Sequence, residues 1–562
     1  MPQQSPFQID IPATDVLTYL FPPNTTPSNK PIYIDAVEPD KKSLSPKQLL
    51  QWVKRLGLGL QRLGLRQREV VMLYSSNHIF VPVAYLGVAG SGHVFSGCSP
   101  AYGVAETVYQ IENTGAQAIL VDPDHLKVVL AAAQKCNFPK DRIFLFSDTP
   151  CETTQGIRDW RTMLADPSDA ELWDWEHMNA DQSRTTTAVL NYSSGTTGLP
   201  KGVMISHQNI IANVEQSVYM RNLESPVPLT HTHHTTDERW LGFLPLYHAY
   251  GQLWSIVAAA KTLTPCFYMR SFSYPAWLSH IQNHRITHIQ TAPPILVMLA
   301  KRPETRKYDL SSLRNILCGA APLSKELQNE VSGLWNGTLK VVQTWGMTEV
   351  TCSCLHVPGH RDDRSGSVGY IDPNAQIKLI DDEGREVGPG ERGEIHVKGP
   401  NICLGYWRNE KATNEVFDEE GFLKTGDVAI RNEEGLYWIV DRKKELIKVK
   451  GFQVAPAELE AVLLENEDVA DAAVVALQLE HEELPRAYVV LKDAAKGSVT
   501  EDDIRKWMNE RVAKHKQLLG GVKFIDEVPK SPSGKIQRKV MRDWAARDAK
   551  EMNLGPTMKA KL

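Results

Sequence analysis

The chain has 562 residues, more than the roughly 250 to 300 at which a single hydrophobic core stops growing, so we expect at least two domains. Its hydrophobic content of 42% and charged content of 23% are ordinary for a globular protein and exclude a fibrous or disordered class. A formal net charge of −5 offers no basic surface that could neutralise a run of phosphates, so the sequence predicts no nucleic-acid partner.

The two ends of the chain differ in the targeting signals they carry. The N-terminal segment lacks a basic region followed by an apolar stretch, so the sequence predicts no secretory signal and we expect the protein to stay inside the cell. The last three residues, Ala560, Lys561 and Leu562, resemble the Ser-Lys-Leu peroxisomal address. This resemblance predicts a peroxisomal location and an import receptor as a partner, with the cytosol as the alternative.

Segment 45–65 is predicted to be an amphipathic helix. Its apolar residues recur at helical spacing: Leu49, Leu50, Val53, Leu56, Leu60 and Leu63. Segment 70–92 is the most apolar long window, but Ser75, Ser76, Asn77 and His78 interrupt it. It falls short of the roughly 20 apolar residues that span a bilayer, so we interpret it as buried core and expect no integral membrane segment.

Short apolar runs at 118–121, 143–146, 188–190 and 286–289 alternate with helical stretches further along the chain. This alternation predicts α/β layers with largely parallel sheets. The cysteines are scattered, and Cys352 and Cys354 do not have redox or zinc spacing, so we expect buried reduced thiols. His231, His233 and His234 also match no zinc pattern, and no metal is predicted there.

The pattern of apolar, glycine and charged residues changes at two places in the last third of the chain. Strands at 376–380 and 393–398 are separated by glycine turns and predict a small antiparallel sheet or barrel. The charged run 441–445 then precedes new apolar strands and is typical of a linker. The predicted fold is α/β: a large N-terminal domain (1–440) of two α/β layered sheets plus a small β-barrel, a hinge (441–445), a small mobile α+β C-terminal domain (446–550), and a tail (551–562).

A dense glycine-rich run is the first motif that carries chemistry. The run Tyr192-Ser193-Ser194-Gly195-Thr196-Thr197-Gly198-Leu199-Pro200-Lys201-Gly202 follows a strand-like segment and precedes a helix capped by Ser206. Hydroxyls and open backbone N–H groups in such a strand-to-helix loop suit the oxygens of a polyphosphate. The run is not a Walker loop, because Gly202 rather than Ser or Thr follows Lys201. The alternative is a flexible surface loop.

Further motifs follow in a fixed order: Tyr247-His248, Gly319-Ala320-Ala321-Pro322, Gln343-Thr344-Trp345-Gly346-Met347-Thr348-Glu349, Thr425-Gly426-Asp427, 441–448 and 529–535. Together with the glycine-rich run they resemble the adenylate-forming superfamily of acyl-CoA synthetases, coumarate–CoA ligases, beetle luciferases and peptide-synthetase adenylation domains. The coumarate–CoA ligase branch is the most similar. The resemblance covers about residues 45–538 and implies ATP, Mg²⁺ and coenzyme A as cofactors and substrates.

The resemblance implies roles for the nucleotide-binding residues. The phosphates of ATP would be cradled by Ser193, Ser194, Gly195, Thr196, Thr197, Gly198 and Lys201. Adenine would lie between the ring of Trp345 and a backbone wall formed by Gly319, Ala320, Ala321 and Pro322. The family more often has Tyr at the position of Trp345. The same motif contributes the other predicted nucleotide-binding residues Gln343, Thr344, Gly346 and Met347. Thr348 would contact the α-phosphate and Glu349 would bind magnesium. Asp427, supported by Arg442, would accept hydrogen bonds from the ribose.

The resemblance also implies a moving catalytic lysine. Lys535 would bridge the substrate carboxylate and the α-phosphate during adenylation. The C-terminal domain would then rotate about Lys444, bringing Lys448, Lys450 and Gly451 to the thiol tunnel.

The acid is predicted to contact Tyr247, His248, Tyr250, Leu253, Met269, Leu317 and Gly319. His248 resembles the aromatic gate beside the acyl carbonyl. Leu253 and Leu317 stand where plant coumarate ligases have Asn and Lys, so we expect a hydrophobic aryl or medium-chain acid rather than a hydroxycinnamate. The predicted activity is an acid–CoA ligase that forms an acyl-AMP. A luciferase-like adenylating oxygenase and a non-catalytic acyl- or nucleotide-binding protein are the alternatives.

Overall fold

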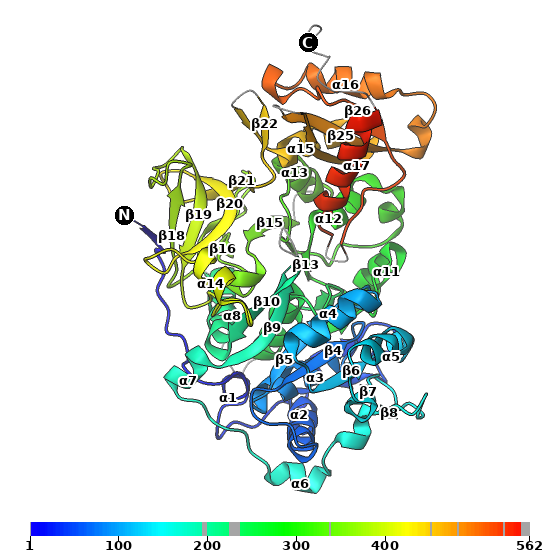
Figure 1. Cartoon of the computed structure of the whole chain (residues 1–562), viewed down its shortest axis with the longest axis vertical. Coiled ribbons are helices and arrows are strands. Elements are labelled where there is room, and N and C mark those ends of the chain that lie inside the picture. The colour runs from blue at the N-terminus through cyan, green and yellow to red at the C-terminus, as the bar shows by residue number, and fades with distance from the viewer. Residues whose placement is uncertain are drawn as a thin grey trace.

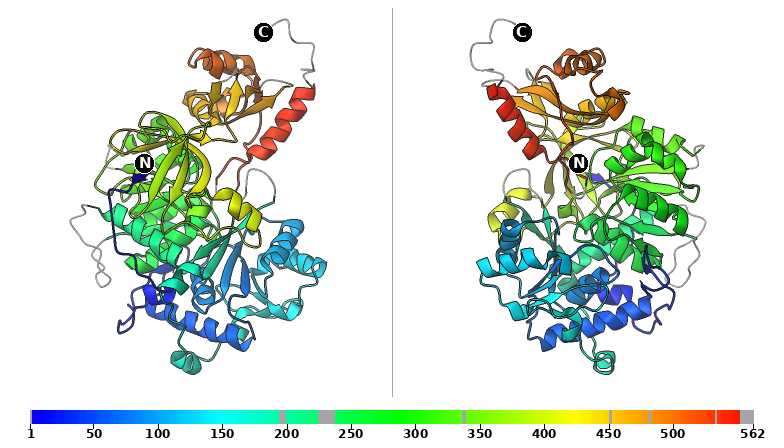
Figure 2. Two further views of the ribbon diagram at one scale, coloured as in Figure 1. Left: turned by 60° about the vertical axis from the view of Figure 1, so that its left-hand side comes forward. Right: turned by 90° about the vertical axis from the view of Figure 1, so that its right-hand side faces the viewer.

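The structure is a computed structural model that describes residues 2–193, 199–223, 237–335, 339–449, 452–479, 483–531 and 534–551. Two large sheets with flanking helices form its body (Figures 1 and 2). A small antiparallel sheet lies beside them, and a C-terminal α+β unit occupies one end of the molecule. The predicted α/β class is confirmed.

The first large sheet has the strand order β10-β9-β5-β4-β6-β7-β8. Its strands are β4 (Val70–Tyr74), β5 (Val94–Cys98), β6 (Ala118–Val121), β7 (Ile143–Leu145), β8 (Arg158–Asp159), β9 (Thr187–Ser193) and β10 (Lys201–Ser206). All neighbours are parallel except β9 and β10. β4 to β7 are buried along their whole length, which explains their unbroken apolar runs.

The second large sheet has the order β17-β16-β15-β14-β13-β11-β12-β2-β3 and is parallel from β15 to β2. Its strands are β2 (Tyr33–Asp35), β3 (Ser43–Leu44), β11 (Trp240–Gly242), β12 (Cys266–Tyr268), β13 (His288–Thr291), β14 (Asn315–Cys318), β15 (Lys340–Trp345), β16 (Leu355–His356) and β17 (Tyr370–Ile371). The carboxyl ends of β13, β14 and β15 therefore meet at one edge.

Helices cover and separate these sheets: α1 (Val16–Leu20), α2 (Pro46–Arg62), α3 (Val81–Gly90), α4 (Val104–Thr114), α5 (Leu126–Lys135), α6 (Pro167–Leu172), α7 (Ala180–Thr185), α8 (His207–Asn222), α9 (Ala249–Gly251), α10 (Ala259–Thr262), α11 (Tyr274–His284), α12 (Pro293–Lys301) and α13 (Lys325–Gly333). The helix predicted at 45–65 is α2, which Ser45 and Gln48 begin with a capping box. Ser206 caps α8 as predicted. The predicted core window 70–92 contains β4 and α3, whose residues are all buried. No described helix is long and apolar enough to cross a membrane.

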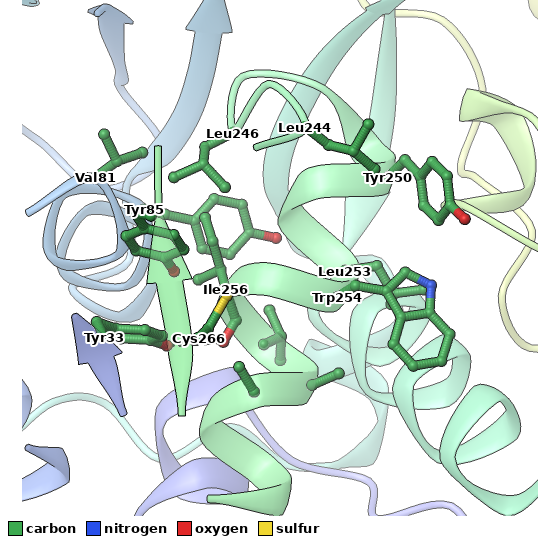
Figure 3. Close-up of a cluster of buried hydrophobic side chains, with 14 of the residues drawn as sticks. Tyr33, Val81, Tyr85, Leu244, Leu246, Tyr250, Leu253, Trp254, Ile256 and Cys266 are labelled. Atoms are coloured by element: carbon green, nitrogen blue, oxygen red, sulfur yellow. Dashed lines mark hydrogen bonds between the residues drawn. The ribbon is translucent and has the colours of Figure 1, made fainter. Parts of the chain in front are cut away.

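The main core fixes the helical segment after His248 between the two sheets (Figure 3). This segment runs from α9 into η4 (Gln252–Ala258), which has π-helical hydrogen bonding. The Tyr33 hydroxyl donates to the Ile256 carbonyl at 2.7 Å, and the Tyr33 and Tyr268 rings stack at 5.7 Å. Ring contacts and hydrogen bonds thus hold η4 against β2 and β12.

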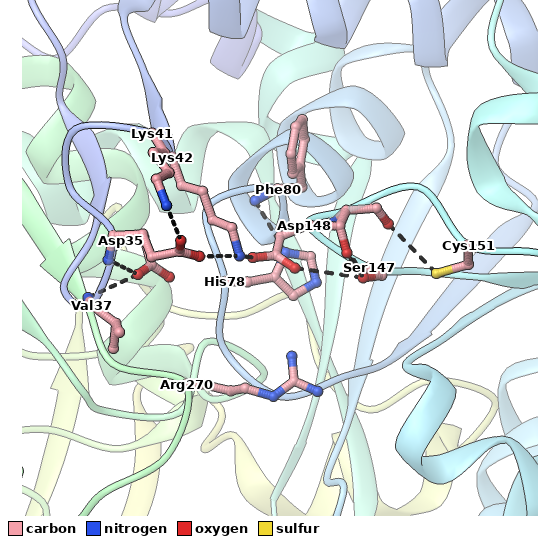
Figure 4. Close-up of polar contacts among 12 residues, drawn as sticks. Asp35, Val37, Lys41, Lys42, His78, Phe80, Ser147, Asp148, Cys151 and Arg270 are labelled. Carbon is pink, nitrogen blue, oxygen red and sulfur yellow. Dashed lines mark hydrogen bonds and ion pairs between the residues drawn. The ribbon is translucent and has the colours of Figure 1, made fainter.

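A charged cluster fixes the N-terminal segment to the carboxyl ends of the first sheet (Figure 4). Lys42 Nζ lies 2.8 Å from Asp148, and Arg270 pairs with Asp122 at 2.9 Å. Burial lowers the pKa of His78 to about 3, so this imidazole is neutral at physiological pH. Because the charges are paired with one another, we interpret this cluster as structural. Each of the eight cysteines is a free thiol, as expected.

The small sheet is antiparallel with the order β1-β18-β19-β20-β21. Its strands are β1 (Gln3–Gln4), β18 (Gln376–Ile380), β19 (Arg392–Lys398), β20 (Leu423–Arg431) and β21 (Tyr437–Arg442), and α14 (Glu410–Val416) lies beside it. In the part of the chain that the structure describes, β1 and β21 do not pair, so this unit is an open sheet rather than the small barrel of the prediction.

The C-terminal unit has its own apolar clusters, separate from those of the large sheets. It contains β22 (Ile447–Val449), β23 (Phe452–Val454), β24 (Val469–Gln478), β25 (Glu483–Leu491), β26 (Val522–Phe524), α15 (Pro456–Glu465), α16 (Glu501–Asn509) and α17 (Arg538–Glu551). The predicted hinge 441–445 takes in the last two residues of β21 and continues into the turn before β22. Across it, the Asp441 carboxylate accepts a hydrogen bond from the Ala457 N–H at the start of α15, at 3.1 Å.

One local prediction is wrong. The glycine-rich run does not lead from a strand into a helix, because β10 lies between the run and α8. β9 and β10 form an antiparallel pair in which Ser193 is opposite Lys201. The run is therefore a hairpin connection, and residues 194–198 lie outside the described residues.

Candidate functional site

The motifs, which are spread along the sequence, come together at one place in the fold. Gly319 follows β14, and the turn with Thr348 and Glu349 follows β15. Asp427 comes from β20 of the small sheet, and Lys535 from the turn before α17. Ligands of open α/β sheets bind outside the carboxyl ends of the strands, which is where these groups gather.

Glu349 lies at the centre of a hydrogen-bonded group and is only 5% exposed. The Ser193 and Tyr406 hydroxyls both donate to its Oε1 oxygen, each at 3.0 Å. Lys201 Nζ lies over the Tyr406 ring, 4.1 Å from the centroid. Burial, with the charge of Glu349, raises the pKa of Tyr406, so its hydroxyl stays protonated and can donate. Both ends of the hairpin loop are thereby tied to Glu349.

The backbone that carries Thr348 and Glu349 allows little variation. A Cβ at Gly346 would lie 1.8 Å from the Cys352 carbonyl oxygen, so only glycine fits. Thr351 has a φ of +69°, which is rare for a β-branched residue, and its hydroxyl donates to the Asn401 carbonyl at 2.7 Å. The turn is therefore fixed on both sides of Glu349.

Asp427 is 5% exposed and is held through both of its oxygens. The Trp345 indole N–H donates to Oδ2 at 2.9 Å, and Arg442 Nε lies 3.1 Å from Oδ1. Arg442 is opposite Asp427 in the β20–β21 register, so the sheet places this pair side by side. Trp345 itself is 6% exposed, and its ring packs into the core of the small sheet.

The loop that is predicted to form the adenine wall is held in place by hydrogen bonds. The Gly319 N–H donates to the Thr291 carbonyl at 2.9 Å, and Ala320 has a φ of +70°. The Gln343 side chain donates to the Leu323 carbonyl at 3.1 Å, so this predicted nucleotide-binding residue supports the loop. The Thr344 hydroxyl donates to the Leu355 carbonyl at 2.8 Å. Ala321 is half-buried, Pro322 is exposed, and Met347 precedes the Thr348 turn.

Lys535 and His248 approach each other at the same place. Gly534 has a φ of +82°, and a Cβ there would lie 3.3 Å from Pro294, so the lysine turn meets the start of α12. Burial lowers the pKa of Lys535, and the charge of Arg442 lowers it further. Burial, with the charge of Lys535, lowers the pKa of His248 to about 3. The imidazole is thus neutral beside an ammonium group.

Three predicted acid-binding residues come together beside His248. The Tyr250 hydroxyl donates to the Leu317 carbonyl at 2.9 Å, and a Cβ at Gly319 would lie 3.5 Å from the Tyr250 ring. A Cβ at Gly97 would lie 2.8 Å from Tyr247, so Tyr247 packs on the end of β5. Because its hydroxyl already has a partner, Tyr250 offers mainly its ring.

The structure does not bring the remaining acid-binding candidates to Tyr250. Leu253 lines a small internal cavity with Asn191, Gln252 and Thr351. Met269 is buried after β12, where its N–H donates to the Gly242 carbonyl. Their roles stay predictions.

Two residues that position the site were not predicted from the sequence. Tyr406 holds Glu349, as described above. The buried Asn77 amide accepts a hydrogen bond from the Leu246 N–H at 3.0 Å and donates to the Leu244 carbonyl at 2.9 Å. It thus clamps the segment that leads to His248. The sequence signal that could have identified Asn77 is that it is a polar residue within the apolar window 70–92.

Some predictions are not tested by these contacts. Lys444 and Lys448 are exposed, and the Lys448 N–H donates to Glu483 at 2.7 Å. Residues Ser194, Gly195, Thr196, Thr197, Gly198, Lys450, Gly451, His231, His233 and His234 lie outside the described residues.

Sequence comparison shows which families and which named proteins this chain is similar to. The AMP-binding enzyme family matches residues 23–407, and the AMP-binding enzyme C-terminal domain matches residues 458–535. An acyl-CoA synthetase of Alternaria alternata is 36% identical, with 92% of this chain and 88% of the relative covered. A phenylacetyl-CoA ligase of Aspergillus niger is 34% identical, with 95% and 97% covered. A probable 4-coumarate–CoA ligase of Dictyostelium discoideum is 36% identical, with 89% and 90% covered.

Structure comparison agrees on the fold. The anthranilate CoA ligase AuaEII in complex with anthranoyl-AMP superposes with a TM-score of 0.83, covering 96% of this chain and 99% of that one. At 22% identity this likeness bears on the fold alone. The two family matches cover most of the chain, and each of the three relatives is aligned over 89% or more of it. The chain therefore belongs to the AMP-binding enzyme family, in its 4-coumarate–CoA-ligase-like branch.

Proposed function

We propose that the protein is an ATP-dependent, AMP-forming acid–CoA ligase that acts on a hydrophobic aryl or medium-chain acid. The observation that carries the ligase assignment is the convergence of Glu349, Asp427 and Lys535, from three units of the fold, close enough for both carboxylates to influence the pKa of the lysine. The names of the three relatives, all CoA ligases or acyl-CoA synthetases, support the same reaction.

In the first half-reaction, a carboxylate oxygen attacks the α-phosphorus of ATP and pyrophosphate leaves. Two anions must approach, so positive charge between them lowers the barrier. Lys535 supplies that charge, and Thr348 contacts the α-phosphate. The neutral imidazole of His248 lies beside the acyl carbonyl without adding a competing charge.

Magnesium fits the arrangement around Glu349. Both hydroxyl donors bind Oε1, and within the described residues no hydrogen bond or ion pair reaches Oε2. Mg²⁺ is commonly bound by one or two carboxylates together with substrate phosphates and water. When bound, the ion would neutralise phosphate charge.

In the second half-reaction, the thiolate of coenzyme A attacks the acyl carbon and AMP leaves. We propose a domain of residues 1–440, a hinge at 441–445 and a mobile domain of 446–550 that rotates about Lys444. The side chain of Lys444 is exposed, so no packing of that side chain opposes the rotation. Rotation would withdraw Lys535 and bring Lys448 toward the thiol.

The class of acid is proposed from the groups beside His248. The ring of Tyr250 and the side chain of Leu317 are apolar, and the Tyr250 hydroxyl is engaged with a backbone carbonyl. A polar substituent on the acid would find few partners there. The phenylacetyl-CoA ligase relative acts on an aryl acid that lacks a hydroxyl, which supports this proposal.

A panel of carboxylic acids with ATP, Mg²⁺ and coenzyme A tests the assignment. AMP and thioester are measured in the same reaction, with Lys535→Ala as the inactive control. We expect equal amounts of AMP and thioester. Oxygen uptake with AMP but no thioester would indicate the luciferase-like alternative. Nucleotide binding without turnover of any acid would indicate a non-catalytic protein.

Peroxisomal import is proposed from Ala560, Lys561 and Leu562, which lie outside the described residues. A fluorescent protein fused to the N-terminus of the chain is compared with the same fusion lacking these three residues. Punctate fluorescence that colocalises with a peroxisomal marker, and that the truncation abolishes, is expected. Cytosolic fluorescence of both fusions would remove the proposal and leave the ligase assignment intact.

A further inference from the structure

Trp345 and Asp427 form a direct contact that connects the second large sheet to the small sheet. The indole N–H of Trp345, at the end of β15, donates to Asp427 Oδ2 on β20 at 2.9 Å. Only 6% of Trp345 is exposed, because its ring packs among the apolar side chains of the small sheet. The polar edge of the indole is therefore committed to the carboxylate.

The remaining acceptor positions of Asp427 match the needs of a ribose. An ionised carboxylate offers about four lone-pair positions, two on each oxygen. Trp345 occupies one on Oδ2 by a hydrogen bond, and Arg442 forms an ion pair with Oδ1 at 3.1 Å. Each oxygen thus keeps at least one position for a ribose hydroxyl. The hydrogen bond on one oxygen and the ion pair on the other oppose rotation of the carboxylate about its Cβ–Cγ bond.

We propose that Trp345 is a positioning residue that orients Asp427 for the two hydroxyls of ribose, so that the indole N–H sets the selectivity of the enzyme for ribonucleotides. Arg442 alone would hold one oxygen of Asp427. Trp345 adds the second fixed point, and a charge-assisted hydrogen bond of this kind is both short and directional. This inference rests on the proposed role of Asp427 in the ligase reaction.

The test compares Trp345→Phe with the wild-type enzyme, because phenylalanine keeps an aromatic ring and removes the N–H. Dissociation constants are measured by calorimetry for ATP, 2′-deoxy-ATP, 3′-deoxy-ATP and GTP. The loss of a hydrogen bond to a charged group predicts binding of ATP that is weaker by about tenfold. The preference for ATP over both deoxy analogues should fall by a similar factor, whereas the ATP-to-GTP ratio should not change.

A double-mutant cycle with Asp427→Ala separates the positioning role from stacking. If Trp345 acts through Asp427, Trp345→Phe should not weaken ATP binding further in the Asp427→Ala background. An equal loss in both backgrounds, or a changed ATP-to-GTP ratio, would overturn the inference in favour of direct contact with the base. Unchanged ATP binding by Asp427→Ala alone would instead refute the proposed ribose role. Should Trp345→Phe fail to fold, Trp345→Tyr, which also lacks the indole N–H, is measured in the same way.

Discussion

Lys535 lies close enough to His248 for its positive charge to lower the pKa of the imidazole, although the two residues are far apart in the sequence. The C-terminal unit is thus docked with its lysine over the acid-binding residues. This is the orientation that adenylation requires, since the lysine must reach both the carboxylate and the α-phosphate. Three of the predictions below follow from this docking.

Replacing Lys535 with alanine should abolish adenylation but spare the second half-reaction. The side chain that neutralises the two anions is lost, whereas the thiol attack does not use it. Pyrophosphate release from acid and ATP should fall by at least about a hundredfold, while supplied acyl-AMP is still converted with coenzyme A. Lys530→Ala is the matched control, because Lys530 lies on the same turn and pairs with Asp471. Pyrophosphate release by Lys535→Ala at the wild-type rate would contradict the assignment.

The rate of adenylation should fall as the pH rises. The fall should begin at a lower pH than it would if the pKa of Lys535 were that of an ordinary lysine. Burial and Arg442 lower the pKa of Lys535, so its proton leaves below the usual value of about 10.4. The expected profile of kcat/KM for adenylation therefore falls on the alkaline side, whereas conversion of supplied acyl-AMP does not share this limb. Lys535→Arg, which stays charged, should remove the limb at reduced rate. The same limb in Lys535→Arg would assign it to another group.

Removing the Tyr406 hydroxyl should weaken the adenylation step through Glu349. Tyr406→Phe keeps the ring beneath Lys201 but leaves Ser193 as the one described donor to Oε1. A hydrogen bond to a charged group is worth roughly 1.5 to 3 kcal/mol, so kcat/KM should fall by about tenfold or more. The apparent affinity for Mg²⁺, measured by Mn²⁺ binding to the enzyme–ATP complex, should fall as well.

Tyr437→Phe provides the control for that variant. The hydroxyl of Tyr437 is buried and has no hydrogen-bond partner among the described residues, so its removal should change neither quantity. Comparable losses in the two variants would indicate a general effect on the fold instead of a contact with Glu349.

A phenolic hydroxyl on the acid should reduce activity. Against Leu317 and the ring of Tyr250 it would lose water without gaining a partner, at a cost of roughly 1 to 3 kcal/mol. We therefore expect kcat/KM for cinnamate or octanoate to exceed that for 4-coumarate by about one to two powers of ten. Leu317→Lys should narrow the difference. A clear preference of the wild-type enzyme for 4-coumarate would refute the apolar site and leave the ligase reaction intact.

Fixing the backbone at Lys444 should uncouple the two half-reactions. Lys444→Pro sets φ near −65° and should hold the C-terminal unit in one orientation. Lys444→Ala removes the same side chain while leaving φ free, so it should preserve the passage from acyl-AMP to thioester. Rapid-quench measurement of both steps distinguishes the variants. If both steps proceed normally in Lys444→Pro, the hinge lies elsewhere.

The sequence predicted those features that depend on neighbouring residues. Ser206 was recognised as a helix cap directly before an apolar helical pattern, and the helix at 45–65 was recognised from the spacing of its apolar residues. The strand at 118–121 was predicted from its apolar run, which is buried throughout. Most motif residues were identified through the family resemblance. That resemblance depends on the order of the motifs along the chain and not on how the chain folds.

The features that escaped prediction depend on contacts between distant segments. Tyr406 and Trp345 reach Glu349 and Asp427 from other units of the fold, and no local pattern encodes such pairs. The hairpin at the glycine-rich run was missed for a different reason. The strand Lys201–Ser206 is short and ends at the residue that caps the next helix, so the helix signal concealed the strand.

The hydrogen bond between Asp441 and Ala457 biases the equilibrium between the two proposed orientations. Asp441 precedes the pivot at Lys444, whereas Ala457 begins a helix beyond it, so rotation would separate donor from acceptor. A helix cap contributes about 1 kcal/mol, which corresponds to roughly a fivefold population ratio. The free enzyme would therefore rest mainly in the orientation ready for ATP. The bound acyl-AMP and coenzyme A must supply the opposing free energy, which makes the cap a determinant of the order in which the substrates bind.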